Sequence, residues 1–219
     1  MATLRGTGGA DVLTGTAARD LIFGRGGDDT IEGRDGADWL SGGTGNDLLR
    51  GGNGYDAIWG DAGDDRVSGG TGQDELDGGD GNDRLWGDAG DDRVEGGAGD
   101  DQLWGDGKVE APGDGRDVLS GAEGDDRLWG GGGDDVAYGG DGDDTLRGGS
   151  GRDTLVGEHL GRASDAASHA DVLDGGAGDD VLWGDREGID LGGASFSDGD
   201  DLLRGGAGND WRSGVADPT

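Results

Sequence analysis

The chain has 219 residues, of which 58 are glycine, 2 are proline and none is cysteine, and its 17 basic and 50 acidic side chains give a formal net charge of −33. Two prolines exclude a collagen helix, and the lack of cysteine excludes disulfide bonds and thiolate metal sites. The charge excludes nucleic acids and anionic membranes as direct partners, because both are bound through positive charge on the protein. Apolar runs of only a few residues predict no membrane insertion.

The chain divides into a short N-terminal segment, a long repeat and a short tail. Residues 1–5 are expected to form an N-terminal cap in which Leu4 covers the first coil of the repeat. Residues 6–213 consist of twenty nine-residue units, counted from Gly6, with three insertions of 7, 9 and 12 residues in units 12, 17 and 19. Because this repeat leaves no linker, it is predicted to be a single domain, followed by a C-terminal tail at 214–219.

Each position of the unit has its own residue preference. Position one is glycine and position six is aspartate in all twenty units, and position eight is Leu, Ile or Val in all but two, where Ala137 and Arg212 stand. Glycines at positions one, two and four indicate a tight turn, and positions seven to nine a short strand with only position eight pointing inward. One aliphatic side chain per unit cannot stabilise an isolated hairpin. The units are therefore predicted to stack as about ten coils of two units each, forming two parallel sheets around an aliphatic ladder.

This stacking superposes the position-six carboxylates of alternate units at roughly 4.8 Å, a spacing at which like charges repel strongly unless a cation bridges them. Carboxylates and backbone carbonyls in a glycine loop offer only oxygen, which favours calcium over magnesium and excludes zinc. The candidate metal ligands are Asp11, Asp20, Asp29, Asp38, Asp47, Asp56, Asp65, Asp74, Asp83, Asp92, Asp101, Asp117, Asp126, Asp135, Asp144, Asp153, Asp171, Asp180, Asp201 and Asp210.

The tandem units, such as GGTGNDLLR and GGNGYDAIW, resemble the RTX or hemolysin-type calcium-binding nonapeptide repeats. The resemblance implies an all-β, right-handed parallel β-roll, a β-solenoid, whose Ca²⁺ ions lie between one turn and the turn two units later. It also implies a secreted, extracellular protein exported by a type I route. We therefore expect a calcium-binding module that is unfolded without calcium and folds on binding multiple ions.

The number of ions follows from the gaps between stacked turns. Two edges of ten turns offer at most eighteen gaps. Each gap is named by the units on either side of it. The insertions are expected to disturb gaps 10/12, 12/14, 15/17 and 17/19. Unit 2, which begins GTAARD, lacks loop glycines and is expected to weaken one more gap. We therefore expect about a dozen calcium sites.

Three tryptophans at position nine of units 9, 11 and 13 predict a consecutive ladder on the outer face of one sheet. Trp86, Trp104 and Trp129, with Arg84 and Arg127 beside them as cation–π partners, form a candidate ligand surface for a polysaccharide or a protein. This surface suggests an alternative function, an adhesion or carbohydrate-binding module. The competing interpretation is structural, with the rings packing across strands or under a lid formed by residues 108–113.

No catalytic residue is predicted, and we expect a monomeric protein without enzymatic activity. The sequence contains neither an H-E-x-x-H element nor a G-x-S-x-G nucleophile elbow. His159 and His169 lie within one insertion but lack a specific metal-ligand spacing. Trp211 and Arg212 in unit 20 are expected to end the stacking.

Overall fold

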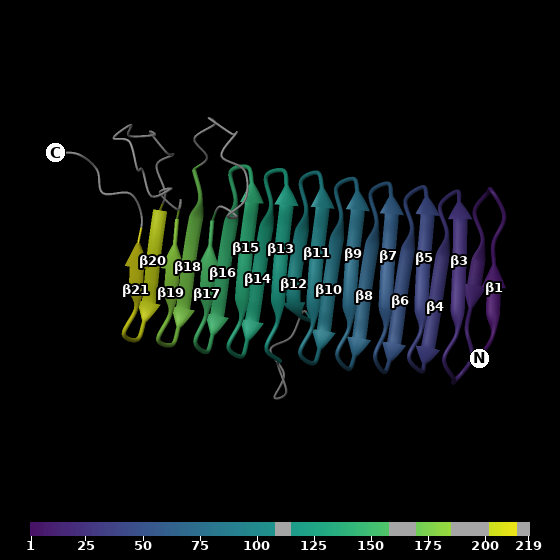
Figure 1. Cartoon of the computed structure of the whole chain (residues 1–219), viewed down its shortest axis with the longest axis horizontal. Coiled ribbons are helices and arrows are strands. Elements are labelled where there is room, and N and C mark those ends of the chain that lie inside the picture. The colour runs from purple at the N-terminus through teal and green to yellow at the C-terminus, as the bar shows by residue number, and fades with distance from the viewer. Residues whose placement is uncertain (108–114, 158–169, 185–201, 214–219) are drawn as a thin grey trace, which may run out of the picture.

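The computed structural model describes residues 1–107, 115–157, 170–184 and 202–213. Its described residues form an all-β parallel roll, as predicted, with twenty-one strands in two sheets (Figure 1). Odd-numbered strands form an eleven-stranded sheet and even-numbered strands a ten-stranded sheet, each in chain order. The strands are β1 (Thr3–Arg5), β2 (Val12–Thr14), β3 (Leu21–Gly26), β4 (Thr30–Asp35), β5 (Trp39–Thr44), β6 (Leu48–Asn53), β7 (Ala57–Ala62), β8 (Arg66–Thr71), β9 (Glu75–Asp80), β10 (Arg84–Ala89), β11 (Arg93–Ala98), β12 (Gln102–Asp106), β13 (Val118–Glu123), β14 (Arg127–Gly132), β15 (Val136–Asp141), β16 (Thr145–Ser150), β17 (Thr154–Val156), β18 (Val172–Ala177), β19 (Val181–Trp183), β20 (Leu202–Ala207) and β21 (Trp211–Ser213).

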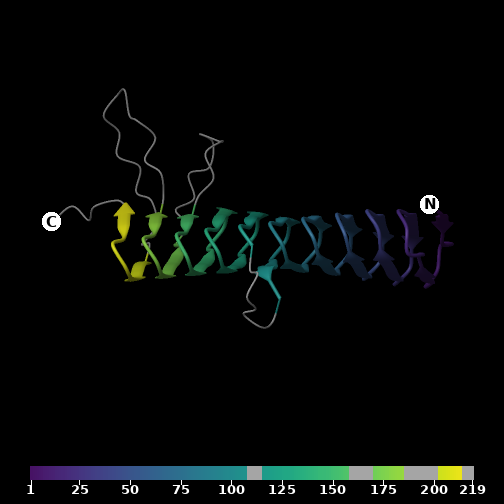
Figure 2. The same ribbon diagram turned by 90° about the horizontal axis from the view of Figure 1, so that it is seen from below.

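Successive coils pair in register along a straight stack of strands, which Figure 2 shows edge-on. Leu85 of β10, for example, pairs with Val67 of β8 on one side and Leu103 of β12 on the other. The prediction of three-residue strands is wrong, because most strands run on through positions one to three of the next unit. The backbone of these loop residues also pairs between coils, as Asp88 does with Gly70, so the ladder continues into the turn.

The core is the predicted aliphatic ladder. Position-eight side chains from Ile22 to Leu182 are at most 1% exposed, and Ala137 occupies the same place without interrupting the row. Leu4, Leu13 and Leu203 pack against this core and are partly buried. Burial of one aliphatic row between two sheets explains how a chain with few large apolar residues folds.

The N-terminal segment and the strands on either side of the insertions keep the register of the sheets. Residues 1–5 contribute β1, which pairs with β3 and places Leu4 opposite Ile22. The chain returns to the same register after each insertion, since Val94 pairs with Leu119 and Leu146 pairs with Leu173. The predicted lid, both histidines, Asp201 and the tail 214–219 lie outside the described residues. In the described part of the chain, no helix has the length and apolar character needed to cross a bilayer.

Candidate metal sites

The position-six aspartates line both edges of the roll, buried in the turns between strands. From Asp20 to Asp180 every described member of the set is at most 3% exposed. One carboxylate oxygen, Oδ1, accepts a hydrogen bond from the backbone N–H of the position-six aspartate in the preceding coil of the same edge. Asp65 N–H donates to Asp83 Oδ1 at 2.8 Å, and Asp83 N–H donates to Asp101 Oδ1 at 2.8 Å. The side chains are thereby held at a fixed orientation along each edge.

In the interior coils, beginning with Asp29, the other oxygen, Oδ2, is buried and fifteen of these aspartates receive no hydrogen bond on it from the described residues. Because a buried carboxylate oxygen without a partner is costly, the arrangement calls for a donor or a cation at each of these positions. Fifteen aspartates share this feature and also lie opposite a glycine carbonyl of the next coil: Asp29, Asp38, Asp47, Asp56, Asp65, Asp74, Asp83, Asp92, Asp101, Asp117, Asp126, Asp135, Asp144, Asp153 and Asp180.

Position-one glycines leave the space into which these oxygens point. A Cβ on Gly60 would overlap Asp65 Oδ2 of its own unit and stand 2.5 Å from the carbonyl oxygen of Gly78 in the next coil. Gly60 does not have a positive φ. Glycine is therefore needed here for space, because a carboxylate oxygen and a carbonyl oxygen of successive coils converge on the same point. This donor set fits a hard cation such as calcium.

Left-handed backbone conformations shape the rest of the turn. Gly43 at position two and Gly45 at position four have φ of 111° and 125°, which glycine adopts at little cost. Position two tolerates larger residues in the same region, at Arg25, Arg34, Asp61, Asp88 and Ala122. The turn is thus specified most strictly at positions one and six, which carry the candidate ligands.

Burial raises the pKa of the interior carboxyl groups, because the charged form loses its hydration. The backbone N–H bond opposes this rise, and carboxylates of neighbouring residues add to it. The resulting pKa is about 7 in Asp65, Asp74, Asp92, Asp126 and Asp135 and about 8 in Asp101, Asp117 and Asp144. Ionising these carboxyl groups near neutral pH is therefore unfavourable unless a positive charge compensates them.

Three of the gaps expected to be disturbed by insertions keep this geometry. Asp92 faces the carbonyl of Gly105 across gap 10/12, Asp117 faces that of Gly130 across gap 12/14, and Asp144 faces that of Gly157 across gap 15/17. The expectation of disturbance is wrong for the position-one and position-six parts of these gaps, because the chain leaves the turn only after position one and rejoins it before position six. Gap 17/19 involves residues outside those described.

The two ends of the row differ from its interior. Asp11 and Asp20 in the first coil receive hydrogen bonds on Oδ2 from threonines of their own turns. At the other end Asp180 N–H donates to Asp210 Oδ1 at 3.4 Å, and Asp210 is only partly buried. Within the described residues, no three His, Cys, Asp or Glu side chains cluster as a metal site. Any ion held here would therefore depend on backbone carbonyls as well as carboxylates.

Asp106 is a buried carboxylate that the repeat rules did not single out. It stands at position two of unit 12, directly before the insertion, and is 5% exposed. Its Oδ2 accepts a hydrogen bond from the backbone N–H of Gly132 at 2.6 Å. Backbone pairing between β12 and β14 ends at Trp104 and Trp129, so this side chain continues the link between coils where the backbone departs. Aspartate also stands at position two in Asp61 and Asp88, so the residue type alone gave no signal, and only the insertion that follows Asp106 sets it apart.

The predicted tryptophan ladder is present on the ten-stranded sheet. Ring centroids of Trp86 and Trp104 lie 4.9 Å apart with planes at 7°, and those of Trp104 and Trp129 lie 4.8 Å apart with planes at 5°. Arg84 and Arg127 lie on the same outward face, as predicted. Both faces of the central indole, Trp104, are therefore covered by its neighbours.

The remaining tryptophans also pair with one another. Trp39 stacks on Trp59 at 4.5 Å, and Trp183 contacts Trp211 at 4.4 Å with planes tilted by 55°. All seven tryptophans thus contact another indole. Packing across strands is the role that this pattern favours.

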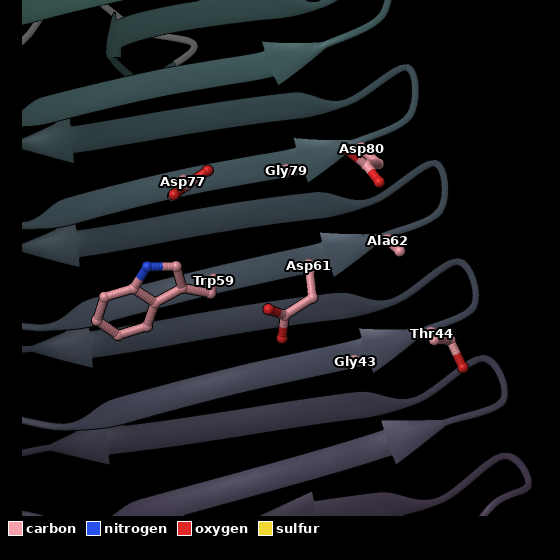
Figure 3. A pocket seen from close by; sticks show the side chains of 8 residues that line it. All are labelled: Gly43, Thr44, Trp59, Asp61, Ala62, Asp77, Gly79 and Asp80. Atoms are coloured by element: carbon pink, nitrogen blue, oxygen red, sulfur yellow. The ribbon is translucent and has the colours of Figure 1, made fainter.

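A hollow of about 390 Å³ lies on the outer face of the eleven-stranded sheet, beside Trp59 (Figure 3). Asp61 and Asp77 approach it from neighbouring strands, and Ser41 Oγ donates a hydrogen bond to Asp61 at 2.6 Å. Partial burial, followed by the charges of Glu95 and Asp61, raises the pKa of Asp77. The hollow lies beside positions two and three of three units, at Gly43, Asp61 and Gly79, and none of the buried position-six aspartates lines it. Its complete lining is Gly43, Thr44, Trp59, Asp61, Ala62, Asp77, Gly79 and Asp80.

The chain has two stacked parallel sheets joined by glycine–aspartate turns, and carboxylate and carbonyl oxygens converge between its coils. These features define the class of calcium-type parallel β-rolls. The family model of the RTX calcium-binding nonapeptide repeat matches residues 5–40, 41–76, 77–107, 113–146, 138–158, 166–186 and 197–211. The chain belongs to this family and is a calcium-binding repeat module. No curated protein matches it.

Proposed function

We propose that this chain is a secreted module that folds when calcium fills its turns, with the position-six aspartates as ligands. The observation that carries this proposal is the buried, unpartnered Oδ2 of the fifteen interior aspartates named above, each of which lies close to a glycine carbonyl oxygen of the next coil. A cation that bridges these two oxygens would satisfy both and neutralise the carboxylate.

Charge supports the same conclusion. Fifteen divalent ions would bring +30 to a chain whose formal net charge is −33. Fifteen interior gaps also exceed the dozen expected from the sequence. The ions would join successive coils, so their binding free energy would be folding free energy. Sites of roughly 10⁻⁴ to 10⁻³ M, typical of extracellular modules, would stay empty in a calcium-poor cytoplasm and fill outside the cell.

A calcium titration followed by far-ultraviolet circular dichroism tests this function. In excess chelator we expect the spectrum of an unfolded chain, and on adding calcium a cooperative gain of β structure. Magnesium at equal concentration serves as the control and should be less effective, because its smaller octahedral shell suits these turns poorly. A β spectrum that is the same in chelator and in calcium would refute folding on binding.

The alternative of a carbohydrate-binding face on Trp86, Trp104 and Trp129 is not favoured by the geometry. Sugar rings stack on open aromatic faces, whereas the faces of Trp104 are covered by the other two indoles at 4.9 and 4.8 Å. The ladder is better explained as packing that holds three coils of one sheet together.

A further inference from the structure

The first coil supplies hydrogen-bond donors to the Oδ2 oxygens of its two position-six aspartates, whereas the interior coils do not. Thr7 donates to Asp11 Oδ2 from its backbone N–H at 2.6 Å and from its hydroxyl at 2.9 Å. Thr16 donates to Asp20 Oδ2 in the same manner, at 2.6 and 2.8 Å. In the interior coils, the equivalent oxygen of the fifteen aspartates named above has no hydrogen-bond donor among the described residues.

The backbone of these two turns differs as well. From unit 3 onward, the regular turns place positive φ at positions two and four, as in Arg25 and Gly27. None of the positive φ angles falls in unit 1 or unit 2. The turns of the first coil therefore take another path, on which the threonine at position two faces its own aspartate.

The carboxylate oxygen is also displaced from the space beside the position-one glycine. Asp11 Oδ2 lies 2.8 Å from the point where a Cβ would stand on Gly6, and Asp20 Oδ2 lies 2.9 Å from that on Gly15. At the fifteen interior positions the corresponding distance is at most 2.5 Å. The oxygen has turned toward the threonine donors, whose positive ends would oppose a cation in the same place.

We propose that Thr7 and Thr16 take the place of calcium in the first coil, so that gaps 1/3 and 2/4 bind no ion and this coil is a metal-free cap. Each aspartate Oδ2 faces the gap that follows it, toward the next coil, so Asp11 and Asp20 are the carboxylates that would otherwise serve these two gaps. The end units of a solenoid must satisfy their own polar groups. Here Thr7 and Thr16 satisfy the carboxylates of Asp11 and Asp20. The inference rests on the proposed calcium-dependent function of the interior turns.

The test counts calcium ions per chain by native mass spectrometry of the full-length protein, backed by equilibrium dialysis. The double variant Asp11→Asn with Asp20→Asn should bind the same number of ions as the unchanged chain. The matched interior double variant, Asp47→Asn with Asp56→Asn, should bind two fewer. Equal losses in both variants would overturn the cap. Failure of the unchanged chain to bind calcium would instead refute the proposed function.

A second variant tests the hydroxyl directly and does not depend on losing a site. Thr7→Gly converts unit 1 to GGGGAD, which has glycine at positions one, two and four like the interior turns. It should bind one ion more than the unchanged chain, whereas Thr7→Ser, which keeps the hydroxyl, should bind none more. If Thr7→Gly and Thr7→Ser bind the same number of ions, the threonine does not close the site and the inference is wrong.

Discussion

Removing calcium should destabilise this fold, and lowering the pH should stabilise the calcium-free fold. The buried carboxyl groups determine the size of both effects. Asp65, Asp74 and Asp126 have an ordinary pKa of 3.8 when the chain is unfolded and a pKa of about 7 in the roll. Their folded pKa is raised, so the folded chain binds more protons than the unfolded chain between these values. Stability without calcium must therefore rise as the pH falls.

The magnitude follows from the same two pKa values. At pH 7.5, ionising one such carboxyl group costs the calcium-free roll about 4 kcal/mol relative to the unfolded chain, and at pH 5 this cost falls to about 1.7 kcal/mol. Each of these three aspartates thus stabilises the calcium-free roll by about 2 to 3 kcal/mol when the pH falls from 7.5 to 5. Several of them together are comparable with the whole stability of a domain, about 5 to 15 kcal/mol.

We therefore expect the chain in excess chelator to be unfolded at pH 7.5 and to gain β structure, measured by far-ultraviolet circular dichroism, as the pH is lowered to 5. This pH remains above the pI of about 4.1, so the net charge stays negative and limits aggregation. Sedimentation velocity at two protein concentrations should show the same species, which controls for association. A chelated chain that gains no β structure between pH 7.5 and 5 would refute the reasoning.

Three further predictions test other parts of the roll. Calcium affinity should fall on acidification from pH 8 to pH 6, measured by isothermal titration calorimetry, because protons and calcium compete for the same carboxylates; an affinity that is unchanged would argue that these groups are not ligands. Gly60→Ala should remove one bound ion and raise the calcium concentration at the midpoint of folding, because its Cβ would overlap Asp65 Oδ2. The control Gly8→Ala, whose Cβ would have nothing within 4 Å, should leave the ion count unchanged. Leu103→Ala should lower the free energy of unfolding of the calcium-loaded chain, measured by urea titration, by roughly 2 to 5 kcal/mol. Leu13→Ala, at the partly buried end of the ladder, should lower it by less, and equal losses would contradict the core assignment.

Much of the fold could be predicted because the period is strict. A nine-residue unit with aspartate at position six and an aliphatic residue at position eight requires stacking, and stacking places residues eighteen apart side by side. This explains why the aliphatic ladder and the neighbouring positions of Trp86, Trp104 and Trp129 were both predicted correctly. The strand length was not, because backbone pairing of the loop residues depends on contacts between coils that no single unit reveals.

The candidate sites divide in the same way. Composition and spacing alone determined that the aspartates line both edges of a roll and that oxygen ligands call for calcium. Only the tertiary structure decided which oxygen of each interior carboxylate accepts a hydrogen bond from a backbone N–H and which has no donor among the described residues, since the donor comes from the adjacent coil. It also decided that Thr7 and Thr16 satisfy Asp11 and Asp20 locally, and that the indole faces cover one another. The physical reason is that the repeat determines which residues become neighbours, whereas side-chain orientation depends on the donors, acceptors and free space that those neighbours provide.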